Sequence, residues 1–189
     1  NKHADTETLY NILTALKEDD SVAFIEAVYS AKEYNVNISL LTSVYQILKQ
    51  HPNLKKGLLD SFSSNQMAAK TALIDAVLSK TELTKESTVA IWGSWYGSIL
   101  IPKLASRVKK IVSIDLDPEP LQIAKNRLFS NYNNIDYICD DIFKTYRDVY
   151  LNTNLIINTS CEHMLPMKEW KWFGAGAMSG DVDRTIFRN

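Results

Sequence analysis

The chain has 189 residues, enough to bury a substantial core, and its composition is that of an ordinary globular protein. A formal net charge of −1 gives no global reason to expect binding to nucleic acid or to an anionic membrane. Two cysteines exclude a disulfide scaffold, no apolar run approaches a bilayer span, and no secretory signal is visible. We therefore expect a cytoplasmic protein without a membrane partner.

Residues 1–80 predict a helical segment. Apolar residues recur at i, i+3, i+4 and i+7, the spacing of one buried helical face, in three sets: Leu9, Ile12, Leu13 and Leu16; Phe24, Ala27, Val28 and Ala31; Leu41, Val44, Ile47 and Leu48. Asp20 or Ser21 is expected to cap the second helix and Ser39 the third. A short helix over 54–62 and one starting after Ser64 follow. This segment could be a lid, a place of homo-oligomerisation or packing alone.

Strands and helices alternate from Thr88 onward. Predicted strands cover 88–92, 111–115, 135–139 and 155–158, and predicted helices cover 99–105, the residues after Asp117, and 142–150. This alternation is typical of a parallel sheet with helices on its faces. The predicted fold class is α/β, a Rossmann-like parallel-rich sheet with flanking helices behind an all-helical segment. We assign 81–173 to the sheet domain and leave 174–189 unassigned, expecting residues to be missing near that tail.

Polar residues gather after each predicted strand. They are Gly93 to Gly97, Asp115, Asp140 with Asp141, and Asn158 to His163. In open parallel sheets ligands bind beyond the carboxyl ends of the strands, so we expect one site along this edge.

Two acids at this edge can hold a nucleoside. The carboxylate of Asp115 can accept hydrogen bonds from both hydroxyls of a ribose, or it can cap a turn with Asp117. Asp141 can accept from an exocyclic amine such as adenine N6, while Asp140 caps the next helix; the two acids can also exchange roles. The glycines stand as G-x-x-x-G rather than G-x-G-x-x-G, which disfavours a dinucleotide pyrophosphate site.

The runs VAIWGSWYG, IVSIDLDPEPLQIAKNR and IDYICDDIF, in this order, resemble the class I S-adenosylmethionine-dependent methyltransferases over about Thr88 to Met164. The resemblance implies S-adenosylmethionine as cofactor. Gly93 and Gly97 match the first and last glycines of the family's acid-x-Gly-x-Gly-x-Gly signature, whereas Trp95 replaces the middle one and Ile91 the acid. The remaining implied contacts are Asp115 with the ribose, and Leu116, Asp141 and Ile142 with adenine.

The aromatic residues of the glycine turn suggest a further contact. Because aromatic faces attract cations, Trp92, Trp95 or Tyr96 could line the sulfonium or the adenine.

NTSCEHM, residues 158–164, follows the last predicted strand, where the family keeps its catalytic residues. Asn158 could orient an acceptor amine, and Glu162 and His163 could act as general base. Cys161 is either a nucleophile or a structural residue. No metal site is indicated, because the histidines and cysteines lack ligand spacing.

We therefore expect an S-adenosylmethionine-dependent methyltransferase whose acceptor is a small molecule, a nucleic acid or a protein. A module that binds S-adenosylmethionine without methyl transfer is the first alternative, and a nicotinamide-dependent oxidoreductase is the second. Methyl transfer from a sulfonium needs mainly alignment and a deprotonated acceptor, and it leaves little catalytic signature in a sequence.

Overall fold

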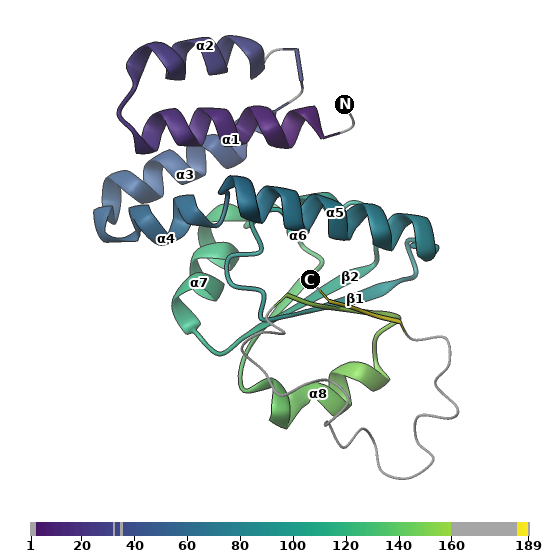
Figure 1. The fold of residues 1–189 in the computed structure, drawn as a ribbon. Helices are drawn as coiled ribbons and strands as arrows, with labels where there is room; N and C mark the ends of the chain where they lie inside the picture. Colours follow the sequence, from purple (N-terminus) through teal and green to yellow (C-terminus); the bar gives the residue numbers. More distant parts are fainter. Residues whose placement is uncertain (1–2, 32, 35, 160–184, 189) are drawn as a thin grey trace.

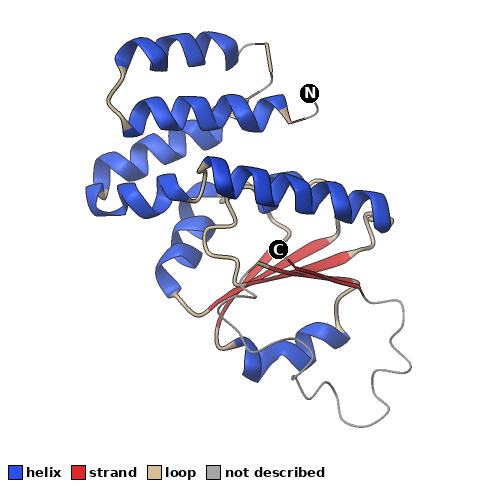
Figure 2. Ribbon diagram, viewed as in Figure 1, coloured by secondary structure: helices blue, strands red, loops and turns tan. Residues whose placement is uncertain are grey.

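The computed structural model describes residues 3–31, 33–34, 36–159 and 185–188. Helices occupy the first part of the chain and a parallel sheet the second, as Figure 1 and Figure 2 show. The predicted α/β fold class, with its helical N-terminal segment, is confirmed. No helix in the described ranges combines the length and apolar character that crossing a membrane requires.

The N-terminal segment forms the helices that its apolar spacing predicts: α1 (Ala4–Lys17), α2 (Ser21–Ala31), α3 (Ile38–Gln50), the short η1 (Pro52–Leu54), α4 (Lys55–Asp60) and α5 (Ser64–Lys80). Asp20 caps α2, because its Oδ1 accepts the N–H of Ala23 at 3.0 Å. The predicted Ser39 cap of α3 is wrong: the side chain of Asn37 accepts the N–H of Leu40 and starts the helix earlier.

The sheet contains β1 (Thr88–Trp92), β2 (Lys110–Asp115), β3 (Ile135–Cys139), β4 (Leu155–Asn158) and β5 (Thr185–Arg188) in the order β3-β2-β1-β4-β5. Every neighbouring pair is parallel. Strand β5 falls in the segment left unassigned from the sequence, so the sheet extends into that segment.

The crossovers determine which helices cover each face of the sheet. Helices α6 (Leu100–Leu104) and α7 (Pro118–Ile123), with the π-helical turn η2 (Ala124–Leu128), connect strands that step from β1 towards β3. Helix α8 (Ile142–Leu151) carries the chain back from β3 to β4. Right-handed crossovers in opposite directions place their helices on opposite faces, and Figure 1 shows α8 across the sheet from α5 and α6.

One hydrophobic cluster runs from the N-terminal helices into the sheet. Ile47 of α3 and Leu58 of α4 belong to it, and so do Ile101 of α6 and Ile91 of β1. All of these side chains are fully buried. The helical segment is therefore held against the sheet domain by shared apolar packing.

Candidate functional site

The site predicted from the sequence lies along the carboxyl edge of the sheet. Strands β1 and β4 are neighbours in the sheet. Strand β2 follows β1 towards one edge of the sheet, and β5 lies beyond β4 towards the other edge. The carboxyl ends of β1 and β4 are therefore the topological switch point. The predicted loop Gly93–Gly97 follows β1, Asp115 ends β2, Asp141 follows β3, and Asn158 ends β4. The fold thus brings these residues to one edge.

The loop after β1 contains three residues in the left-handed backbone region. Their φ angles are 65° at Gly93, 54° at Trp95 and 66° at Gly97. Glycine adopts this conformation without penalty, but a side chain costs about 1–2 kcal/mol. Trp95 therefore adopts a conformation that glycine favours, and the surrounding structure must offset the strain.

Asp115 fastens this loop to the end of β2. Its Oδ2 accepts the backbone N–H of Trp95 at 2.7 Å, and its Oδ1 accepts the N–H of Asp117 at 3.0 Å. These contacts match the alternative in which Asp115 caps a turn with Asp117, and the ribose role stays a prediction. A carboxylate offers about four acceptor positions, so two remain for a ligand hydroxyl.

Hydroxyl groups hold the remainder of the loop. Ser113 of β2 donates to Ser94 Oγ at 2.6 Å, and both side chains are buried. Thr159 Oγ1, beyond β4, contacts the carbonyl oxygens of Trp92 at 3.0 Å and Gly93 at 2.8 Å. The Thr159 hydroxyl has a single proton, so it donates one hydrogen bond that the two carbonyl oxygens share. The loop is thus tied to the strands on both sides of β1.

Asp140 and Asp141 both take part in starting α8. Oδ1 of Asp141 accepts the N–H of Phe143 at 2.9 Å, while Oδ1 of Asp140 accepts the N–H of Asp141 at 2.7 Å. Asp141 is therefore the helix cap, the role that the sequence suggested for Asp140 with exchange as an alternative. The backbone N–H of Asp140 also donates to the carbonyl of Asp115 at 3.2 Å, which places the two strand ends side by side.

Apolar side chains flank the two acids. Leu116 is 72% exposed and Phe143 is 41% exposed, whereas Ile142 is only 7% exposed. Exposed apolar groups beside a polar site suit the faces of a planar base. Phe143 was not among the site residues predicted from the sequence. Its aromatic ring directly after the Asp-Asp-Ile run was the available signal, but exposure depends on how α8 is oriented.

The three aromatic residues at the loop differ in their surroundings. Trp92 is fully buried in β1 and Tyr96 is 4% exposed, while the partly buried Trp95 packs at the edge of the core. The rings of Trp95 and Tyr96 lie 5.3 Å apart at an interplanar angle of 47°. Burial in the protein interior thus accounts for Trp92 and Tyr96 without a ligand. A sulfonium contact by Trp95 stays a prediction.

Tyr96 lies within the electrostatic reach of the helix that follows β2. Burial raises the pKa of its hydroxyl above the ordinary value, and the negative charges of Glu119 and Asp117 raise the pKa further. Tyr96 therefore remains a neutral hydrogen-bonding group at physiological pH and supplies no charge to the site.

The remaining predicted catalytic residues divide into two groups. Asn158 is fully buried at the end of β4, opposite Trp92 of β1 and Arg188 of β5 in strand register. Glu162, His163 and Cys161 lie outside the described residues. Within the described ranges no three His, Cys, Asp or Glu side chains gather as metal ligands.

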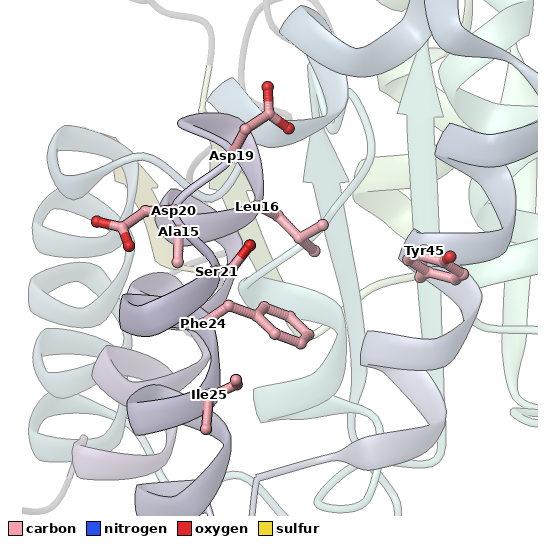
Figure 3. Close-up of a pocket in the computed structure, with 8 residues that line it drawn as sticks. All are labelled: Ala15, Leu16, Asp19, Asp20, Ser21, Phe24, Ile25 and Tyr45. Carbon is pink, nitrogen blue, oxygen red and sulfur yellow. The ribbon is translucent and has the colours of Figure 1, made fainter.

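Two hollows lie beside the N-terminal helices. One, of about 310 Å³, opens between the α1–α2 turn and α3, where Leu16, Phe24 and Tyr45 line it (Figure 3). The other, of about 190 Å³, lies between α1 and α6 beside the ion pair of Lys103 with Asp5. Neither hollow includes a residue predicted to bind the cofactor.

No protein-family model matches the chain. Among curated proteins, the probable ribosomal RNA small subunit methyltransferase A of Methanosarcina mazei is 31% identical over 101 residues, which cover 53% of this chain and 35% of the relative. Its counterpart in Methanosarcina barkeri is 28% identical over 111 residues, covering 59% and 36%. The resemblance to methyltransferases is confirmed. The chain spans about a third of the length of these relatives.

Three solved structures resemble part of this chain. An rRNA methylase from Streptococcus thermophilus has a TM-score of 0.36 at 24% identity, covering 41% of this chain and 46% of that one. A dimethyladenosine transferase from Plasmodium falciparum has a TM-score of 0.40 at 23% identity, covering 51% and 32%. The N-methyltransferase NodS from Bradyrhizobium japonicum, bound to S-adenosylhomocysteine, has a TM-score of 0.42 at 20% identity, covering 55% and 50%.

Proposed function

We propose that this chain binds S-adenosylmethionine at the carboxyl edge of its sheet and transfers the methyl group to an acceptor. The observation that carries the proposal is the pair of acids on adjoining strand ends, Asp115 and Asp141, beside a left-handed glycine loop. The hydrogen bond from Asp140 N–H to the Asp115 carbonyl holds these strand ends together. Sugar and base of one adenosine would span the two carboxylates.

Each acid has acceptor positions left for this task. Asp115 would use the positions not taken by the N–H groups of Trp95 and Asp117 to accept from the ribose hydroxyls. Asp141 accepts the N–H of Phe143 through Oδ1, and its Oδ2 would accept from the adenine amine. The exposed side chains of Leu116 and Phe143 would cover the ring faces, with Ile142 at its edge.

The cofactor supplies an electrophilic methyl group, whose bond electrons stay on sulfur as the methyl passes to the acceptor. This chain must then bring the acceptor atom in line with that methyl group and remove the acceptor's proton. We assign the loop Gly93–Gly97 to the approach of the methionine part, and Asn158 to orienting the acceptor. Glu162 and His163 remain our candidates for the base that takes the proton.

RNA is the acceptor class to test first, since both curated relatives are named as ribosomal RNA methyltransferases. The net charge of −1 means that a long-range field would contribute little to RNA binding. Recognition would therefore rest on local contacts or on a partner.

Calorimetry with S-adenosylhomocysteine tests the cofactor site, with the Asp115→Asn and Asp141→Asn variants beside the wild type. Heat from the wild type and weaker binding by both variants is the expected result. No heat, with NADH binding instead, would favour the oxidoreductase alternative. Radiolabelled methyl transfer to small-subunit rRNA, total protein and small-molecule extract then separates an enzyme from a module that binds without transfer.

Self-association through the N-terminal helices and a cytoplasmic location stay predictions. Helix α2 exposes Val22, Ile25 and Tyr29 at helical spacing, each by more than half of its surface. This apolar stripe is where we expect a second copy to bind, and sedimentation of wild type against Ile25→Asp measures it.

A further inference from the structure

Helix α4 of the N-terminal segment packs directly on the loop that follows β1. A Cβ placed on Gly57 would lie 3.7 Å from the Tyr96 hydroxyl oxygen and 4.0 Å from Cζ2 of Trp95. One helical turn later, Ser61 Oγ lies 2.7 Å from Ser98 Oγ, and both serines are buried. Gly57 within α4 therefore lies against Trp95 and Tyr96 of the loop. Ser61, directly after α4, forms a hydrogen bond with Ser98, the residue that follows the loop.

The direction of the serine hydrogen bond follows from the number of protons. Ser61 Oγ donates its single hydrogen to the carbonyl oxygen of Leu58. Ser98 must therefore donate to Ser61 Oγ. Removing Ser61 Oγ would leave the buried Ser98 hydroxyl without this acceptor, in a place that water does not reach readily.

Trp95 is the residue that needs this support. Its φ of 54° is disfavoured for a side chain as bulky as indole, yet its N–H is the one that Asp115 accepts. If the loop relaxed, the Asp115 carboxylate would lose this donor and its fixed orientation. The ring of Trp95, lying against Tyr96 and beside Gly57, resists that relaxation.

We propose that Gly57 and Ser61 are positioning residues that hold the cofactor loop in its binding conformation without contacting the cofactor. This inference rests on the proposed function, because it assigns a role to the same site. A glycine at position 95 would adopt this φ without strain and would make such support unnecessary. Here helix α4 compensates for Trp95 at that position.

Substitutions of graded size at Gly57 test the proposal by calorimetry with S-adenosylhomocysteine. The distances leave room for one methyl group, so Gly57→Ala should change the dissociation constant by less than about twofold. Gly57→Leu must displace the Trp95 and Tyr96 rings and should weaken binding by about tenfold or more. Ser61→Ala should weaken it by roughly threefold to tenfold.

The control separates positioning from general stability. Ile47→Val in α3 removes a methyl group from a fully buried site of the same helical segment, away from the loop. It should lower the midpoint of thermal unfolding and leave the dissociation constant unchanged.

A rescue variant adds a readout that a merely structural role would not move. Trp95→Gly removes the indole ring and the backbone strain, so Leu at position 57 meets only Tyr96 and the loop no longer depends on support for Trp95. Gly57→Leu combined with Trp95→Gly should bind within about twofold of Trp95→Gly alone.

The outcomes distinguish this inference from the function on which it rests. Absence of binding by the wild type overturns the proposed function and this inference with it. Wild-type binding together with equal affinity in a cooperatively folded Gly57→Leu variant overturns the positioning role alone. If Gly57→Leu does not fold, Ser61→Ala decides: an unchanged dissociation constant overturns the role, and a weakened one supports it.

Discussion

The backbone N–H of Trp95 donates to Oδ2 of Asp115 at 2.7 Å and so joins the turn after β1 to the last residue of β2. The same carboxylate is the group that we propose for the ribose. Loop order and ligand binding are therefore linked through one side chain. A hydrogen bond within the protein that fixes the loop lowers the entropy cost of arranging it on binding.

We expect Asp115→Asn to weaken binding of S-adenosylhomocysteine by roughly 10- to 100-fold, the loss of one or two charge-assisted hydrogen bonds. The amide has a single acceptor oxygen, so it cannot serve Trp95 and Asp117 as the carboxylate does. Calorimetry measures the loss. Asp136→Asn is the matched control, since Asp136 pairs with Lys110 near the other end of β2. Equal affinities for the two variants would contradict the assignment.

Gly97→Ala should lower the free energy of unfolding by about 1–3 kcal/mol. Its φ of 66° disfavours any side chain, and an added Cβ would lie 2.8 Å from Cγ1 of Ile101. Urea denaturation followed by circular dichroism gives the value. Gly57→Ala is the comparison, because that glycine lies within α4 and an alanine there fits, so stability should hold or rise. A neutral Gly97→Ala would show that the turn can rearrange.

Stability should decrease above about pH 10, the ordinary pKa of tyrosine. Burial raises the pKa of Tyr137 and of Tyr96, so between the ordinary and the raised values the folded chain holds more protons than the unfolded chain. The free energy of unfolding then falls with rising pH. Below about pH 10 the stabilising contribution of the two protonated tyrosines is present in full. Urea unfolding in a series of alkaline buffers measures this slope.

Tyr137→Phe should make this alkaline loss shallower. The Tyr137 hydroxyl is buried without a hydrogen-bond partner in the described part of the chain, so its removal should also raise stability at neutral pH by up to about 1 kcal/mol. Tyr45→Phe, at a side chain that is 52% exposed, is the control and should change neither quantity. If the free energy of unfolding falls with pH as steeply in Tyr137→Phe as in the wild type, groups other than Tyr137 cause the alkaline loss of stability.

Cofactor binding should protect Cys139 from alkylation. This exposed thiol ends β3 between the two proposed acids, with Sγ 3.5 Å from the carbonyl of Leu116. In a Cys161→Ser background, S-adenosylhomocysteine at ten times its dissociation constant should slow the reaction with iodoacetamide about tenfold, because only the unbound fraction reacts. Adenine alone at the same concentration is the control. An unprotected thiol would place the ligand away from the end of β3.

The sequence predicted the order of helices and strands because local signals dominate there. Asp117 and Pro118 mark the start of α7. Each predicted strand is a mainly apolar run that ends at, or is followed by, polar residues. The cap of α3 was assigned two residues late because Asn37 and Ser39 are both good capping residues. Strand β5 is only four residues long, and its identity as a strand comes from pairing with β4 rather than from its own pattern.

Non-local contacts account for what the sequence left open at the site. The aromatic residues of the loop suggested a ligand, whereas Tyr96 is buried and Trp95 packs against it, beside Gly57 from a distant part of the chain. Both acids were found from their places after strands, but the capping role of Asp141 required the geometry of α8. The exposure of the Phe143 side chain also depends on how α8 is oriented, so it could not be predicted from the sequence.

The strand order also has a consequence during synthesis on the ribosome. Strand β1 lies in the middle of the sheet, and both of its neighbours, β2 and β4, emerge after it. Helices α1 to α5 of the described chain are complete by then, and they can collapse among themselves while β1 still has no pairing partner. The nascent loop after β1 would thus meet an existing helical surface first and its sheet second.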